Sequence, residues 1–241
     1  MSGHSKWNNI KHKKEKADAA KAKIFTKIGK EMAVAIKEGG PDPSNNSRLR
    51  DLIAKAKANN VPNDNIQRTI KKFTESNDIN YEEIIYEGYG PSGVAIIVET
   101  STDNRNRTAG NVRAAFNKYG GNLGQNGCVG FLFEEKGVIT IVDEDDELDE
   151  DKVMEDALEC GAEDIKCDEG EYTIYTSVDD FAEVREAVIA LGYTLATADL
   201  AKVPSTYVDL DNEEDIENME KMLDKFNEDD DVNAVYHNWN A

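Results

Sequence analysis

The spacing of the apolar residues changes near residue 75, and this change divides the chain into a helical part and a mixed part. Before it, Ile24, Ile28, Met32 and Ile36 recur at four-residue steps, which place them on one stripe of a helix. After Glu75 the apolar residues alternate with polar ones or form short runs, as strands do. The chain therefore predicts a helical domain followed by α/β structure.

The first 77 residues predict a bundle of three helices. The first helix is expected from Ala17 to Glu38, and Gly39-Gly40-Pro41 ends it with a glycine available for the left-handed cap. Ser47 can cap a second helix, which stops before Val61-Pro62. A third runs from about Asn63 to Phe73. Each helix has one apolar stripe, so the three can share a core.

The remaining sequence predicts alternating strands and helices. Strands are expected at Ile84–Glu87, Val94–Thr100, Cys128–Phe133, Val138–Val142, Asp164–Cys167, Tyr172–Thr176, Thr194–Ala201, Thr206–Leu210 and Val232–Asn238, and helices at Thr108–Tyr119, Asp149–Glu159, Val178–Leu191 and Glu213–Phe226. Residues 136–203 then have the order βαββαβ of the split ferredoxin-like motif. The flanking segments complete a second βαββαβ order if 128–133 and 206–210 are strands of one sheet.

We therefore predict an α+β chain with an N-terminal three-helix bundle followed by two ferredoxin-like βαββαβ domains, one inserted into the other. The expected domains are a basic helical bundle at 1–77, a discontinuous α/β domain at 78–135 and 204–241, and an inserted acidic ferredoxin-like domain at 136–203. The ends of a hairpin lie close together, so an insertion there adds little loop-closure entropy.

The formal charge of −21 conceals two segments of opposite sign. Residues 1–73 contain 17 Lys and Arg against 7 Asp and Glu, which leaves 11 basic and 42 acidic residues for the rest of the chain. A net charge of +10 against −31 predicts a polyanionic partner for the first segment only. The alternative is a solvated lysine-rich face, with Trp7 packing the N-terminal segment against the bundle. That alternative would suit an isolated lysine, but this density of cations favours nucleic-acid binding.

Lysines contact phosphates as point charges, and an aromatic ring can stack on a base. The candidate nucleic-acid-binding residues of the basic segment are Lys6, Trp7, Lys11, Lys13, Lys14, Lys16, Lys21, Lys23, Lys27, Arg48, Lys55, Lys57, Arg68, Lys71 and Lys72, with His4 and His12 among them.

Arg105 and Arg107 are two further candidates in a short polar loop between a strand and a helix. Two interpretations are open for this loop. The arginines can grip phosphates or a partner carboxylate, or the loop is a helix cap formed by Asp103, Asn104 or Asn106.

Other segments lack the motifs of common sites. Glu87–Gly93 is rich in glycine but lacks the GK[ST] ending of a phosphate-binding loop, so a tight turn is the better interpretation. The acidic run Asp143–Asp151 lacks the glycine of a calcium loop and is interpreted as a solvated linker. The three cysteines, Cys128, Cys160 and Cys167, form no CxxC pair, which favours a reducing compartment and no metal site.

Catalysis and membrane insertion find no support in the sequence. It contains three histidines and neither an HExxH nor a GxSxG motif, so we expect no enzymatic activity and no cofactor. No stretch approaches the roughly 20 apolar residues of a membrane span, and the opening has no apolar signal region. A cytoplasmic protein without a membrane partner is expected.

Five motifs resemble the YebC/PmpR family. They are Gly3–Trp7 (GHSKW), Glu38–Gly40 (EGG), Tyr86–Pro91 (YEGYGP), Thr102–Thr108 (TDNRNRT) and Gly120–Gly124 (GGNLG), and the similarity extends to the C-terminal segment, over nearly the whole chain.

The resemblance implies a three-domain cytoplasmic protein that regulates transcription and binds DNA. Mitochondrial relatives that activate translation, and an association with ribosomes handling proline-rich nascent chains, imply ribosomal RNA as an alternative target. Ribosomal or transcription-machinery proteins are further possible partners. One departure is Cys128, where the family usually has serine. A different class of function, a protein-interaction module acting through the acidic α/β domains, also stays open.

Overall fold

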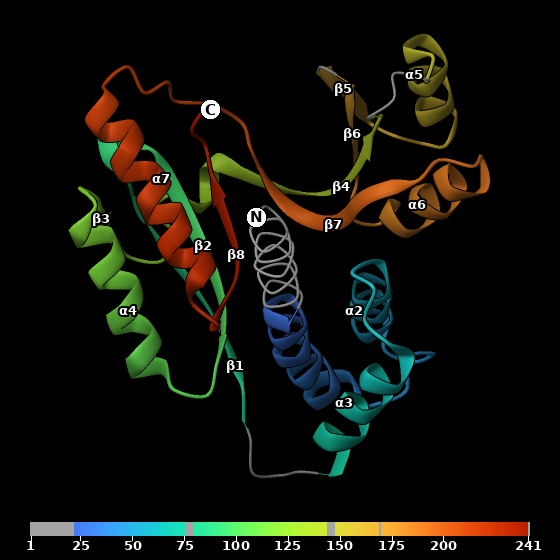
Figure 1. Ribbon diagram of the computed structural model, residues 1–241, viewed down its shortest axis with the longest axis horizontal. Coiled ribbons are helices and arrows are strands. Elements are labelled where there is room, and N and C mark those ends of the chain that lie inside the picture. Colours follow the sequence, from blue (N-terminus) through green and yellow to red (C-terminus); the bar gives the residue numbers. More distant parts are fainter. Residues whose placement is uncertain (1–21, 76–79, 144–147, 169, 241) are drawn as a thin grey trace, which may run out of the picture. The chain divides into compact units, whose positions relative to one another are not determined.

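The computed structural model describes residues 22–75, 80–143, 148–168 and 170–240 (Figure 1). They form two compact units. The first unit combines the described residues up to Cys128 with Asp209–Trp239, and the second unit is Val129–Val208. Seven candidate residues lie outside the described residues: Lys6, Trp7, Lys11, Lys13, Lys14, Lys16 and Lys21.

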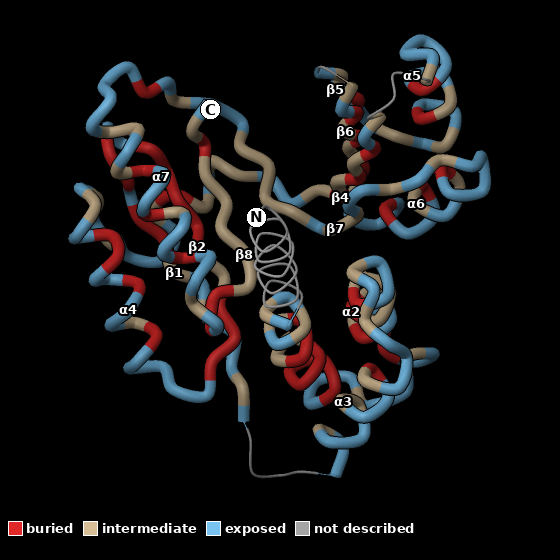
Figure 2. Tube along the Cα trace, viewed as in Figure 1, coloured by how far each residue is buried: buried red, intermediate tan, exposed pale blue. Residues whose placement is uncertain are grey.

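The helical part of the first unit contains three helices, as predicted. They are residues 22–39 of the first helix, α2 (Ser47–Ala58) and α3 (Asn63–Glu75). Their apolar stripes meet in a core that includes Ile28, Met32, Leu49 and Ile66, each at most 1% exposed (Figure 2). Gly40, with a φ of 83°, ends the first helix in the left-handed conformation that the sequence predicts.

The cap of α2 is Asn46, and the prediction of Ser47 is wrong by one residue. The Asn46 Oδ1 atom accepts a hydrogen bond from the backbone N–H of Leu49 at 3.0 Å. Its Nδ2 atom donates to the carbonyl oxygens of Ala35 and Gly40, both at 2.8 Å. The asparagine amide can donate two hydrogen bonds while its oxygen accepts one, so it can link two helices at a buried position. A serine hydroxyl has a single proton and cannot make all three bonds.

The α/β part of the first unit contains a four-stranded antiparallel sheet in the order β3-β1-β2-β8. Its elements are β1 (Glu82–Tyr89), the 3-10 helix η1 (Pro91–Gly93), β2 (Ala95–Thr102), α4 (Arg105–Lys118), β3 (Asn122–Leu123), α7 (Glu213–Glu228) and β8 (Val232–His237). Helices α4 and α7 pack beside each other on one face of the sheet (Figure 1). The rings of Phe116 and Phe226, 5.3 Å apart between centroids, fill the space between them.

The predicted strands at 128–133 and 206–210 are wrong. Gly130–Leu132 form the 3-10 helix η2, and 206–210 contribute no strand to either sheet. In the sheet, β1 lies between β3 and β2, and along the chain it precedes β2 in a hairpin. The chain order of this domain is therefore ββαβαβ and differs from the predicted βαββαβ. An apolar run does not by itself specify a strand, and Phe131 at 74% exposure shows that this run does not form a buried face.

The second unit has the predicted ferredoxin-like order βαββαβ. Its elements are β4 (Phe133–Val142), α5 (Glu150–Glu159), β5 (Asp164–Asp168), β6 (Glu171–Thr176), α6 (Phe181–Ala190) and β7 (Leu195–Pro204). The sheet order is β5-β6-β4-β7, all antiparallel, and its core includes Ile139, Ile174, Val153 and Val184. The α+β class is confirmed, whereas the division at residues 77, 135 and 203 stays a prediction about which parts fold independently.

A pair of glycine substitutions tests the register of β1 against β3 in the first sheet. A Cβ atom at Gly88 would lie 2.5 Å from the carbonyl oxygen of Asn122, so Gly88→Ala should lower the free energy of unfolding by about 1–3 kcal/mol. Gly110 lies inside α4, and a Cβ atom there would have nothing within 4 Å. Gly110→Ala should therefore raise the free energy of unfolding by about 0.5–1 kcal/mol. Urea unfolding of both variants measures the difference, and equal effects would contradict the strand register.

Candidate nucleic-acid interface

The first helix has a second face, which is made of lysines. Lys23, Lys27 and Lys30 follow at steps of four and three residues, so their side chains leave the same side of the helix. The ammonium groups of Lys23 and Lys27 donate to the carbonyl oxygens of Glu228 and Asn227, the second over 3.1 Å. These carbonyls belong to the last turn of α7, the negative end of its helix dipole. Two cations predicted to hold phosphate therefore hold the end of a helix.

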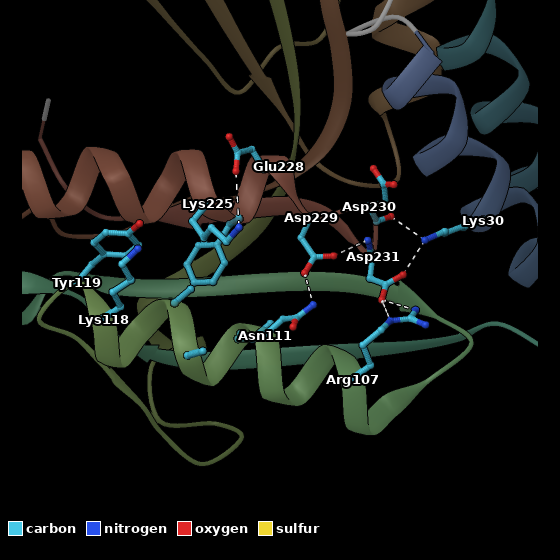
Figure 3. A pocket seen from close by; sticks show the side chains of 14 residues that line it. Lys30, Arg107, Asn111, Lys118, Tyr119, Lys225, Glu228, Asp229, Asp230 and Asp231 are labelled. Atoms are coloured by element: carbon cyan, nitrogen blue, oxygen red, sulfur yellow. Dashed lines mark hydrogen bonds and ion pairs between the residues drawn. The ribbon is translucent and has the colours of Figure 1, made fainter.

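Asp231 lies where this face meets the start of α4 (Figure 3). Its side chain is 4% exposed. Lys30 Nζ lies 2.7 Å from one carboxylate oxygen, and Arg107 Nη2 and Thr108 Oγ1 lie 2.6 and 2.8 Å from the other. Burial alone would raise the pKa of Asp231, but the hydrogen bonds from Lys30, Arg107 and Thr108 lower it to about 2. The sequence prediction included Arg107 and missed Lys30 and Asp231.

The loop before α4 is a helix cap, and the cap is Asn104. Its Oδ1 atom accepts the backbone N–H of Arg107 at 3.0 Å. The Arg107 guanidinium donates to Asp103 at 2.8 Å as well as to Asp231, and these hydrogen bonds raise its pKa. Arg107 is thus engaged inside the first unit. Arg105 is different, because its side chain is 69% exposed and its ion pair with Glu82 is 4.0 Å long.

The exposed cations in the described part of the bundle are Lys37 on the first helix, Arg50 and Lys57 on α2, and Arg68, Lys71 and Lys72 on α3. Arg68, Lys71 and Lys72 form a stripe on α3 opposite the buried Ile66, and all three are exposed. Lys71 lies 3.9 Å from Glu75, and both side chains are at least two-thirds exposed. Such a pair contributes little and is open to exchange with a phosphate. We call Arg68, Lys71 and Lys72 the α3 stripe.

Three further candidates of α2 differ in their surroundings. Lys57 is exposed, whereas Lys55 is half-buried. Arg48 donates to Glu38 at 3.0 Å and to Glu83, so it joins the bundle to β1. The structure therefore leaves Lys57 accessible and assigns Arg48 an internal role.

A groove with a cavity volume of about 560 Å³ runs between α4 and α7 (Figure 3). Its lining includes four cations, Lys30, Arg107, Lys118 and Lys225, and four carboxylates, Glu228, Asp229, Asp230 and Asp231. A hydrogen bond of 3.0 Å from Asn111 to Asp229 crosses it. Because the opposite charges balance, the groove by itself has no preference for a polyanion.

The described residues show no metal-binding group of three or more His, Cys, Asp or Glu side chains. Cys128, Cys160 and Cys167 are free, and burial raises the pKa of each thiol, which leaves them poor nucleophiles. In the same part of the chain, no helix combines the length and the apolar character needed to span a membrane.

Two family models match the chain. The TACO1/YebC protein N-terminal domain matches residues 5–76, and the TACO1/YebC second and third domain matches residues 81–239. A probable transcriptional regulatory protein of Agathobacter rectalis is 56% identical over 99% of both chains. Another, from Clostridium botulinum strain Eklund 17B, is 58% identical over 99% of this chain and 96% of its own. The crystal structure of the conserved hypothetical protein Aq1575 from Aquifex aeolicus has a TM-score of 0.84 and 43% identity, covering 92% of this chain and 91% of the other.

The buried carboxylate of Asp231 should make stability depend on pH. Its pKa is about 2 in the folded protein and near 3.9 in an unfolded chain, so its contribution of about 2 kcal/mol is present above pH 4 and is lost as the pH falls toward 2. Asp231→Asn should cost about 3 kcal/mol at pH 7, because Lys30 and Arg107 lose their counter-charge. Urea unfolding from pH 6 to pH 2 should show the difference between the two proteins shrinking, and a constant difference would contradict the assigned pKa.

The two arginines of the loop should behave differently when each is replaced by alanine. Arg107→Ala should lower the free energy of unfolding by about 2–3 kcal/mol, because it leaves the buried Asp231 short of a charged donor. Arg105→Ala should change it by less than about 0.5 kcal/mol, since the side chain is exposed. Thermal unfolding measures both, and equal effects would disprove the internal role of Arg107.

Proposed function

We propose, on the premise that this chain belongs to the TACO1/YebC family, that it is a non-enzymatic regulator of gene expression that binds nucleic acid through its N-terminal helices. The names of its relatives support regulation of transcription, and therefore DNA as the target. The observation that carries the proposal is the α3 stripe, whose three cations are exposed and lie on one side of a helix. Lys57 and Arg105, also exposed, are further proposed contacts.

The charge of the rest of the chain supports the same surface. Beyond residue 73 the sequence has 42 acidic and 11 basic residues, so a polyanion is repelled there and attracted to the N-terminal segment. Each phosphate neutralised by a lysine or arginine releases condensed counterions, which gives about 1 kcal/mol per contact near physiological salt. Three such contacts are enough to make the α3 stripe a measurable part of the affinity.

A structured RNA is the second candidate target, and the composition of the basic segment favours it. Residues 1–73 contain 14 Lys and 3 Arg. Reading of bases in the major groove depends largely on Arg, Asn and Gln, whereas lysine mainly contacts phosphate. A lysine-rich surface therefore suits binding by backbone and shape. Competition between a DNA duplex and a folded RNA with the same number of phosphates separates the two candidates.

Reversal of the α3 stripe tests the proposal. The triple variant Arg68→Glu, Lys71→Glu and Lys72→Glu should weaken binding to nucleic acid by about 100-fold near physiological salt, because three contacts are lost. The slope of log K against log salt should become shallower by about 2–3. Fluorescence anisotropy with a labelled duplex and with a labelled RNA hairpin measures both quantities.

A control with the same change in net charge uses exposed cations elsewhere, namely Arg113, Lys152 and Lys221, each changed to Glu. This control should retain most of the affinity and, like the α3 variant, should unfold within about 1 kcal/mol of the unmodified protein. If both variants lose binding equally, only total charge matters and the assignment of the α3 stripe is wrong.

A further inference from the structure

Two of the cations predicted to hold phosphate already contact negative groups of this chain. Lys23 and Lys27 donate to carbonyl oxygens of the last turn of α7, and the carboxylate of Asp230 lies 3.9 Å from Lys23. Burial lowers the pKa of Lys27 and the charge of Lys23 lowers it further, while Asp230 raises it. Carbonyl oxygens and a carboxylate therefore occupy the positions that phosphate oxygens would take in a complex.

The contacts along this lysine face differ in strength. The pair of Lys30 and Asp231 is 2.7 Å long, and its side chains are 11% and 4% exposed. The pair of Lys23 and Asp230 is 3.9 Å long, and its side chains are 32% and 64% exposed. An exposed pair contributes about 0–1 kcal/mol, whereas removing one partner of a buried pair costs several times as much. The contact is therefore weaker at the Lys23 end than at Lys30.

We propose that Lys23 and Lys27 form a second phosphate-binding surface that residues 227–230 cover in the free protein and that nucleic acid uncovers. The inference rests on the proposed function, because it requires a nucleic acid already held by the α3 stripe. The Lys30–Asp231 pair remains intact and serves as the fixed point of the movement. Residues 227–230 thus act as an internal competitor, and the affinity of the free protein is lower than its cations would give.

Asp230→Asn is the variant that weakens this competitor with least disturbance. The carboxylate of Asp230 is exposed, and the hydrogen bond that Lys30 donates to this residue goes to its backbone oxygen, at 2.8 Å. The variant should bind a short DNA duplex about two- to fivefold more tightly than the unmodified protein. Asp224→Asn is the matched control, because this residue is an exposed acid of α7 with the same charge.

A double-mutant cycle distinguishes competition from simple repulsion of the duplex. Changing Lys23 and Lys27 together to Gln should weaken binding more in the Asp230→Asn protein than in the unmodified one, because only there are the two lysines readily available. Long-range repulsion by Asp230 instead predicts that the two effects multiply independently. Anisotropy titrations of the four full-length proteins give the coupling, and their thermal unfolding verifies that each is folded.

The outcomes separate the two proposals. A coupling of at least twofold, with little effect of Asp224→Asn, supports the covered surface. Independent effects, or equal gains from Asp230→Asn and Asp224→Asn, overturn it while the α3 stripe variant still loses binding. If the unmodified protein binds neither duplex nor RNA hairpin, the proposed function itself fails and this inference with it.

Discussion

The buried carboxylate of Asp231 is the interaction on which the arrangement of the first unit depends. It accepts hydrogen bonds from Lys30 of the first helix and from Arg107 and Thr108 of α4, while its backbone oxygen accepts the N–H of Ser101 in β2 at 2.9 Å. A buried charge is costly unless its partners are complete. The helical part, α4 and the sheet are therefore coupled through one residue, and loss of Lys30 or Arg107 leaves its carboxylate short of a counter-charge in the interior.

This use of charge changes the meaning of the basic N-terminal segment. A net charge of +10 over residues 1–73 describes the sequence, but part of it is neutralised within the chain. Lys23 and Lys27 contact the end of α7, and Lys30 contacts Asp231 just beyond it. Arg48 donates to Glu38 and Glu83. Of the described cations of the bundle that remain exposed, three lie together on α3, and the others are Lys37, Arg50 and Lys57. Net charge thus indicates the class of partner, and only the internal contacts show which side chains can meet it.

The elements set by local pattern were predictable, and those set by distant pairing were not. Helix α7 was predictable because its apolar spacing is regular. It was expected at Glu213–Phe226 and ends at Glu228, two residues later. The place of β1 in the sheet was not predicted, since strand order depends on partners far along the chain. The pairing of Lys30 with Asp231, 201 residues apart, likewise has no local signal. The only clue was the spacing of three lysines, which fits a solvated face equally well.

The two faces of the first helix respond differently to salt. Its apolar face is held by burial of Ile28 and Met32, which depends little on ionic strength. Its lysine face becomes more exposed from Lys30 to Lys23, so screening acts mainly at the Lys23 end. In the proposed complex, salt would weaken two contacts of the same lysines, the one with residues 227–230 and the one with an incoming phosphate. Because these losses partly cancel, a salt slope measured for binding counts fewer phosphate contacts than the complex contains.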